Sequence, residues 1–168
     1  IGIKMFYGCE NLEEVYLGNE VKMIGSHMFY QCRKLRNFTM GNSVKTIERY
    51  AFSETAITEI TIPDTTLCIR TSAFEKCSEL KNVTIGKGVT SIAYEAFWGC
   101  KSLKSIEIPA TVTSIGDRAF GYYFKAMNVL ETVENFIIYG TVGTQAHNYA
   151  KDYGFTFIDK NHTHTKSS

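Results

Sequence analysis

The chain has 168 residues, of which 44% are hydrophobic and 21% charged, and its formal net charge at pH 7 is +1. This composition is typical of a globular protein and excludes a disordered or fibrous chain. A charge so close to neutral gives no general attraction to nucleic acid or to an anionic membrane surface. No apolar run approaches the ~18 residues of a membrane-spanning helix.

One pattern recurs along most of the chain. A phenylalanine occupies the same position in successive segments, and an isoleucine precedes it by five residues each time; the phenylalanines are Phe6, Phe29, Phe52, Phe74, Phe97 and Phe120. They are spaced 23 residues apart, except for one interval of 22. A fixed period of this length indicates a stacked repeat protein. The missing residue falls between Phe52 and Ile57, which predicts a trimmed loop.

Each repeat predicts the same local structure. In the copy that begins at Leu80, alternating apolar residues around Val83 and Ile85 predict a short strand, and Gly86 predicts a turn at the same corner of every coil. A second extended piece, such as 112–115, leads to one helical or 3₁₀ turn around Ala-Phe. Coils stacked about 4.8 Å apart would align like residues, so the phenylalanines should form one column.

The string [LI]-x-x-[VI]-x-[LI]-[GP]-x-x-V-x-x-I-[GE]-x-x-[AM]-F-x-x-C resembles the leucine-rich repeats of the BspA type over residues 1 to about 120. The resemblance implies an α/β repeat fold, a right-handed solenoid with ~23-residue coils. It further implies one short strand per coil on the concave face and short helical or 3₁₀ turns opposite. Common leucine-rich repeats carry Asn or Cys at offset +8 from the leading Leu, bonded to the neighbouring backbone. That ladder should be absent here, because the offset holds Glu20, Ser43, Thr65, Gly88 and Thr111.

The pattern breaks after Phe120. Residues 121–127 predict an insertion with exposed aromatic side chains that bulges from the convex side, and Leu130 and Val133 predict that the strand then restarts. We therefore expect a solenoid over 1–135, a capping segment over 136–158 and a polar tail or linker over 159–168. The chain begins at Ile1, inside a repeat, which suggests a piece of a longer protein.

The capping segment predicts a helix and a strand. Thr144 is a candidate N-cap, 146–153 carries alanine and tyrosine at helical spacing, and Gly154 is placed to end the helix. Residues 155–158 predict the final strand. A helix and strand at this point would cover the open edge of the last coil.

Four of the five cysteines occupy one repeat position, three residues after the phenylalanine: Cys9, Cys32, Cys77 and Cys100. The simplest interpretation is a small buried position where a thiol packs. The alternative is a disulfide between neighbouring coils, from Cys9 to Cys32 and from Cys77 to Cys100. Cys68 lies outside this position and is the better candidate for a reactive thiol.

The sequence contains no convincing catalytic site. Cys100, His147 and Asp152 are the residue types of a thiol hydrolase, but burial in a structural column makes a cysteine a poor nucleophile. His147 could bind a metal with His162 and His164, but that pair lies in the polar tail and is better interpreted as solvated. We therefore predict no enzyme activity, no cofactor and no metal.

The outward positions of the predicted strands, at offsets +2 and +4, form the candidate binding surface. Apart from one aromatic residue, Tyr16, they are short polar or acidic residues, and Arg36, Lys81 and Lys104 lie beside them: Glu14, Tyr16, Asn37, Thr39, Glu59, Thr61, Asn82, Thr84, Ser105 and Glu107, continued by Thr132 and Glu134. Such a surface suits recognition and equally suits a solvated sheet without a partner. Aromatic residues near the phenylalanine position form a second candidate surface if they are exposed, and the alternative is that they are partly buried beneath neighbouring turns: Tyr7, Tyr30, Tyr94, Trp98, Tyr122 and Tyr123.

The resemblance implies a non-enzymatic, extracellular or cell-surface module. It would bind a protein ligand, such as host matrix or another cell surface, and would serve adhesion. Neither nucleic acid nor a membrane span is expected. The alternative is a rigid spacer that presents a neighbouring domain.

Overall fold

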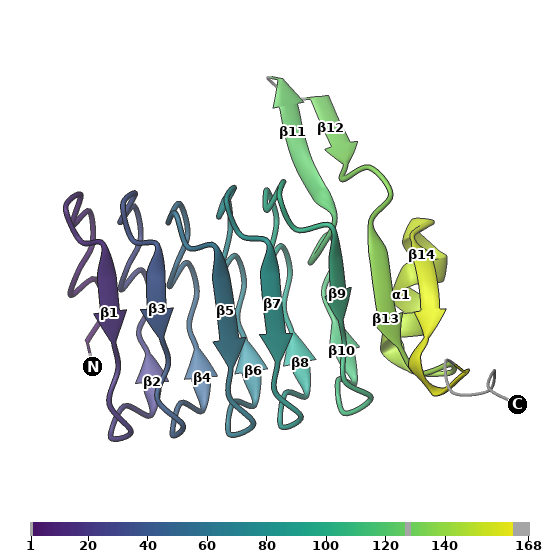
Figure 1. Cartoon of the computed structure of the whole chain (residues 1–168), viewed down its shortest axis with the longest axis horizontal. Helices are drawn as coiled ribbons and strands as arrows, with labels where there is room; N and C mark the ends of the chain where they lie inside the picture. The colour runs from purple at the N-terminus through teal and green to yellow at the C-terminus, as the bar shows by residue number, and fades with distance from the viewer. Residues whose placement is uncertain (1, 127–128, 163–168) are drawn as a thin grey trace, which may run out of the picture.

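The computed structural model describes residues 2–126 and 129–162. The chain winds into coils stacked side by side along one axis, as Figure 1 shows. The front of the stack is a row of parallel strands: β1 (Glu14–Tyr16), β3 (Asn37–Thr39), β5 (Glu59–Ile62), β7 (Asn82–Ile85), β9 (Ser105–Glu107), β13 (Ile137–Gly140) and β14 (Thr156–Asp159). We call the outward surface of this row the strand face. The predicted solenoid is therefore confirmed.

Each of the first five full coils carries a second strand behind the first, where the sequence predicted only an extended piece. These strands are two residues long and form one parallel five-stranded sheet: β2 (Met23–Ile24), β4 (Thr46–Ile47), β6 (Cys68–Ile69), β8 (Ser91–Ile92) and β10 (Ser114–Ile115). Each places its isoleucine against the core. The expectation of one strand per coil was incomplete, because two residues are too short to give an alternating pattern.

The phenylalanine-bearing turns join the second strand back to the first and form what we call the turn edge. The sequence predicted a helical or 3₁₀ turn here, but the turns are neither. Their backbone N–H groups donate alternately to a carbonyl of the next coil and to a carbonyl of the same turn. The N–H of Phe29 donates to the carbonyl of Ala51 in the next coil at 2.8 Å, and the N–H of Tyr30 donates to the carbonyl of His27 at 3.2 Å. Alternation binds each coil to its neighbour, which a continuous helix could not do.

The core is a column of phenylalanine rings. From Phe6 to Phe120, neighbouring rings lie 4.8–5.4 Å apart, and their planes differ by 1–16°. All but Phe6 are fully buried. The 22-residue interval does not interrupt the column, since Phe52 and Phe74 stack at 5.0 Å. The predicted alignment of like residues is confirmed.

The cysteine position has a hydrogen-bonding role besides packing. The thiols of Cys32, Cys77 and Cys100 each donate to the carbonyl of the phenylalanine in the preceding coil, over 3.0–3.2 Å. All five cysteines are free, so the alternative of disulfides between coils was wrong. Burial raises the pKa of Cys32 to about 11 and that of Cys100 well above its usual value.

The glycine- and proline-bearing corners also hold side-chain bonds between coils. Asn19 accepts the backbone N–H of Asn42 at 2.9 Å, and the Thr111 hydroxyl donates to the carbonyl of Val89 at 3.0 Å. The prediction that no such ladder exists was therefore wrong in part. Threonine at offset +8 and Asn or Asp at offset +7 supply some of the side-chain bonds that Asn or Cys at offset +8 supplies in common leucine-rich repeats.

The insertion after Phe120 is a two-stranded antiparallel hairpin, β11 (Tyr122–Ala126) and β12 (Val129–Thr132), that projects beyond the turn edge (Figure 1). It exposes Phe124 as expected, whereas Met127 lies outside the described residues. The predicted strand restart at Leu130 was wrong, because β12 pairs with β11. The front row continues instead with β13, whose Ile137 and Tyr139 take the outward positions expected for Thr132 and Glu134.

Beyond the hairpin, β13 pairs with β9 on one side and with β14 on the other. Helix α1 (Gln145–Tyr153) begins after Thr144 and ends at Gly154, whose φ of 71° lies in the left-handed region, as predicted. The Thr144 side chain makes no capping bond to the helix and donates to the carbonyl of Thr141 instead. Strand β14 and a 3₁₀ helix, η1 (Lys160–His162), extend past the expected end of the cap at residue 158.

Tyr149 of α1 closes the phenylalanine column. Its ring meets Phe120 edge-on at 6.1 Å, and its hydroxyl accepts the N–H of Phe120 at 3.1 Å and donates to the carbonyl of Phe120 at 3.2 Å. Elsewhere these two backbone groups bond to the next coil, for example Phe97 N–H to the carbonyl of Ala119. One hydroxyl thus satisfies both groups where the repeats end.

Candidate functional site

The strand face has the composition and exposure that the sequence predicted. Nine of its ten predicted residues are exposed and Ser105 is half-buried: Glu14, Tyr16, Asn37, Thr39, Glu59, Thr61, Asn82, Thr84, Ser105 and Glu107. The parallel register sets equivalent residues side by side, Glu59 beside Asn82 and Thr61 beside Thr84. The pattern therefore placed these side chains correctly on one surface.

The face is hollowed in its second half. Two adjoining cavities, about 900 Å³ and about 310 Å³, share Val83, Thr84 and Glu107 in their walls. In the part of the chain that the structure describes, no strand pairing joins β7 to β9, nor β3 to β5. Val83 of β7 lines both cavities and is half-buried, although its repeat position points inward. We call this region the face hollow.

The face hollow takes in half of the predicted site: Thr61, Asn82, Thr84, Ser105 and Glu107. The other five, Glu14, Tyr16, Asn37, Thr39 and Glu59, lie on the same face outside it. The cap contributes Lys160, which pairs with Glu107 at 2.9 Å and lies over the ring of Tyr139 at 5.8 Å. The sequence assigned Lys160 to the polar tail, and its proximity to Glu107 depends on the long-range pairing of β14 with β13.

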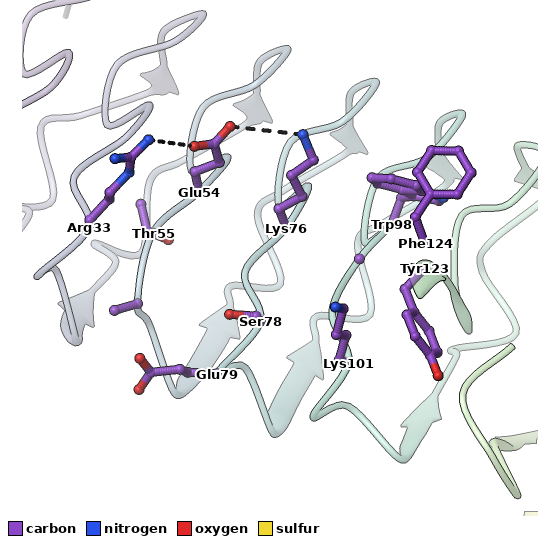
Figure 2. Close-up of a pocket in the computed structure, with 12 residues that line it drawn as sticks. Arg33, Glu54, Thr55, Lys76, Ser78, Glu79, Trp98, Lys101, Tyr123 and Phe124 are labelled. Carbon is purple, nitrogen blue, oxygen red and sulfur yellow. Dashed lines mark hydrogen bonds and ion pairs between the residues drawn. The ribbon is translucent and has the colours of Figure 1, made fainter. Parts of the chain in front are cut away.

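A second concave region lies on the turn edge. It is a groove of about 560 Å³ that crosses several coils and ends beneath the hairpin (Figure 2). Its residues come from the turn edge and from β11: Arg33, Glu54, Thr55, Ala56, Lys76, Ser78, Glu79, Trp98, Gly99, Lys101, Tyr123 and Phe124. We call it the edge groove. It includes Thr55 and Ala56 of the 22-residue interval, where the trimmed turn leaves the edge one residue short.

Glu54 is the centre of the polar part of the edge groove. Its carboxylate pairs with Arg33 at 3.1 Å and Lys76 at 3.9 Å, as Figure 2 shows, and it accepts a hydrogen bond from Gln31 at 3.2 Å. Burial alone would raise the pKa of Glu54, but the hydrogen bonds from Arg33 and Gln31 and the charge of Lys76 outweigh burial and lower it. The carboxylate therefore stays ionised, and these side chains are held in fixed positions.

The aromatic residues singled out in the sequence divide into two groups. Tyr7 and Tyr94 are exposed, and Tyr7 stacks on the half-buried Tyr30 at 5.2 Å. Trp98 is only 7% exposed, because Phe124 of the hairpin lies edge-on against it at 4.9 Å. No pattern in the sequence indicated that Phe124 would contact Trp98, since the hairpin's direction is set by tertiary packing.

The residue types of a hydrolase do not form a catalytic arrangement. The thiol of Cys100 is buried against the carbonyl of Phe74, and its raised pKa disfavours the thiolate. The His147 ring packs on Phe157 at 4.7 Å and accepts the N–H of Gly143. Cys68, the suggested reactive thiol, is half-buried beside the Thr46 hydroxyl at 3.7 Å.

Among residues 2–126 and 129–162, no three His, Cys, Asp or Glu side chains gather as metal ligands would. Of the suggested set of His147, His162 and His164, His164 lies outside the described residues. Over the same residues, no helix combines the length and apolar character that crossing a bilayer requires.

Comparison with protein families places the repeats in a known class. The model of the BspA type leucine rich repeat region matches residues 1–127 in six copies. A search of curated proteins finds no match. The resemblance noted from the repeat string is thus recovered by the family model over most of the chain.

Solved structures give the same result. A leucine rich cell surface protein from Faecalibacterium prausnitzii is 30% identical over 71% of this chain, with a TM-score of 0.54. A leucine rich repeat protein of T. pallidum is 26% identical over 69%, with a TM-score of 0.53. The chain spans only 41% and 65% of those two proteins. A Bacteroides ovatus leucine-rich repeat protein, 21% identical and matched over 95% of this chain and 54% of its own, shares the fold with a TM-score of 0.50.

Proposed function

Because the chain belongs to the family of BspA-type leucine-rich repeat proteins, we propose that it is a non-enzymatic binding module that holds a protein ligand in its face hollow. Repeat arrays recognise partners through extended surfaces built from many coils. The F. prausnitzii relative is described as a cell surface protein, which supports extracellular or cell-surface display of this chain as well. Adhesion to host matrix or to another cell fits that location.

The observation that carries the proposal is the hollow in the strand face at β7 and β9. A hollow of about 900 Å³ with exposed polar residues on its rim and the half-buried Val83 inside offers both an apolar contact and hydrogen-bond partners. Protein interfaces combine an apolar centre with a polar rim in this way. The part of the strand face around β1 and β3 also exposes an aromatic residue, Tyr16, but neither of the two cavities extends to it.

The test uses two substitutions at the same repeat position. Thr84→Arg places a long charged side chain in the face hollow, and Thr39→Arg places it on the flat part of the same face. Both residues are exposed, so neither change should unfold the solenoid. Binding of each variant to immobilised collagen, laminin and fibronectin and to whole cells would be measured against the unmodified chain.

We expect Thr84→Arg to weaken binding at least about tenfold, since an interface centre tolerates little disruption, and Thr39→Arg to leave it nearly unchanged. Equal binding by the two variants would show that the ligand does not bind in the face hollow. If the unmodified chain binds none of these probes, the result would favour the alternative function, a rigid spacer that presents a neighbouring domain. The uninterrupted phenylalanine column would make such a spacer stiff.

A further inference from the structure

The edge groove differs from the face hollow in its chemistry. Three cationic and two acidic side chains line it, together with Trp98, Tyr123 and Phe124 at the end beneath the hairpin. Lys76 lies over the Trp98 ring at 5.9 Å, and Lys101 lies over the Tyr123 ring at 5.1 Å. Aromatic faces and charged groups thus alternate along one continuous surface, as Figure 2 shows for Glu54, Lys76 and Trp98.

The backbone of this edge is already hydrogen-bonded from coil to coil. The N–H of Glu54 donates to the carbonyl of Glu75 at 2.8 Å, and the N–H of Gly99 donates to the carbonyl of Tyr122 at 2.8 Å. An extended peptide that binds by adding a strand needs a row of unpaired backbone groups. The groove offers side chains instead, which favours a ligand recognised through hydroxyl groups and ring faces.

Two groups in the groove lack the partners that their neighbours have. The indole N–H of Trp98 is buried and has no hydrogen-bond acceptor among the described residues. Lys101 makes no ion pair with any described residue, whereas Arg33 and Lys76 both pair with Glu54. A buried donor without an acceptor is unusual in folded proteins and calls for an explanation. An acidic ligand would supply a counter-charge for Lys101.

Phe124 provides the surface for a sugar ring. It is 44% exposed although its ring contacts Trp98, so one part is fixed and the remainder faces solvent. Exposed aromatic rings that are held in place lose little conformational freedom on binding. Its separation from the Glu54 cluster by Lys76 and Trp98 suits a ligand longer than one sugar.

We propose that the edge groove is a second binding site, distinct from the face hollow, for a linear oligosaccharide that carries carboxylate groups. One sugar ring packs on Phe124, its carboxylate pairs with Lys101, and the hydroxyls of the following sugars exchange hydrogen bonds with Glu54, Arg33 and Lys76. The paired charges of that cluster leave their outer lone pairs and N–H groups available to hydroxyls.

The experiment measures binding of short oligogalacturonates to the full chain by calorimetry. Two control ligands separate the parts of the proposal: the methyl-esterified oligomer keeps the sugar and removes the charge, and polyglutamate keeps the charge and removes the sugar. Lys101→Gln removes the cation in the groove, and its matched control, Lys104→Gln, removes an exposed cation beside the strand face. Phe124→Ala removes the sugar platform.

We expect the unmodified chain to bind oligogalacturonate about tenfold more tightly than either control ligand, as one charge-assisted contact allows. Lys101→Gln and Phe124→Ala should each weaken binding about tenfold, and Lys104→Gln and Thr84→Arg should leave it within about twofold. Equal binding of polyglutamate, unchanged binding by Lys101→Gln, or no binding by the unmodified chain would overturn the proposal. Because Lys101 is exposed, its variant remains informative even if Phe124→Ala perturbs the hairpin.

Discussion

The first and last phenylalanines of the column in this sequence differ in how they are covered. At the C-terminal end, Tyr149 covers Phe120 and satisfies its backbone groups. At the other end, Phe6 is only partly buried, and the first coil leaves Ile3 73% and Met5 55% exposed. Since each coil is stabilised mainly by its neighbours, a coil flanked on both sides should be far more sensitive to change than one flanked on a single side.

The largest expected effect is at the centre of the column. Phe74→Ala should cost about 3–5 kcal/mol in the free energy of unfolding, because it leaves a large cavity between two stacked rings. Phe6→Ala should cost clearly less, since that ring stacks on one neighbour and is partly exposed. Urea unfolding of both variants measures the difference. Similar losses would mean that the coils do not behave as a series of nearest-neighbour contacts.

The next prediction concerns the C-terminal end of the phenylalanine column, where Tyr149 loses its hydroxyl. Tyr149→Phe keeps the ring and leaves the N–H and carbonyl of Phe120 without their partner, at a cost of about 1–3 kcal/mol. Tyr153→Phe is the control on the same helix, because its hydroxyl bonds to Asp117 at an exposed position and its loss should cost about 1 kcal/mol or less. Equal thermal stability of the two variants would show that the last coil needs no such bonds.

The last comparison takes one corner position in two coils, and its smallest expected effect is that of Gly18→Ala. A Cβ added at Gly86 would clash with the backbone of Pro63, whereas one added at Gly18 meets nothing within 4 Å. Gly86→Ala should therefore destabilise the chain by about 1–3 kcal/mol. Gly18→Ala should be neutral or stabilising by up to about 1 kcal/mol, through the lower entropy of the unfolded chain. The denaturation midpoint should fall for Gly86→Ala and should stay the same or rise for Gly18→Ala, and an equal fall in both would contradict the comparison.

The repeat pattern predicted most of the structure of each coil. Of the ten residues that it predicted for the strand face, five line the face hollow. The phenylalanine column and the exposure of Glu59 and Asn82 follow from period and alternation alone, because stacked identical units must place like residues together. The hairpin could not be predicted as such, since the alternation around Leu130 is the same whether the strand joins the main row or pairs with β11. Trp98 and Tyr123 of the edge groove were singled out in the sequence, but the groove itself was not predicted, because Trp98 and Phe124 meet only through that hairpin.

The sequence by itself determined the solenoid, its core and the ends of helix α1, because each depends on contacts that repeat at a fixed spacing or lie within a few residues. Only the tertiary structure decided where the strand face opens, how the thiols bond and which side chains finish the column. Those features arise from single contacts between distant segments, such as Tyr149 with Phe120 and Lys160 with Glu107. A contact that occurs once leaves no period in the sequence, and its partner is known only when the chain is folded.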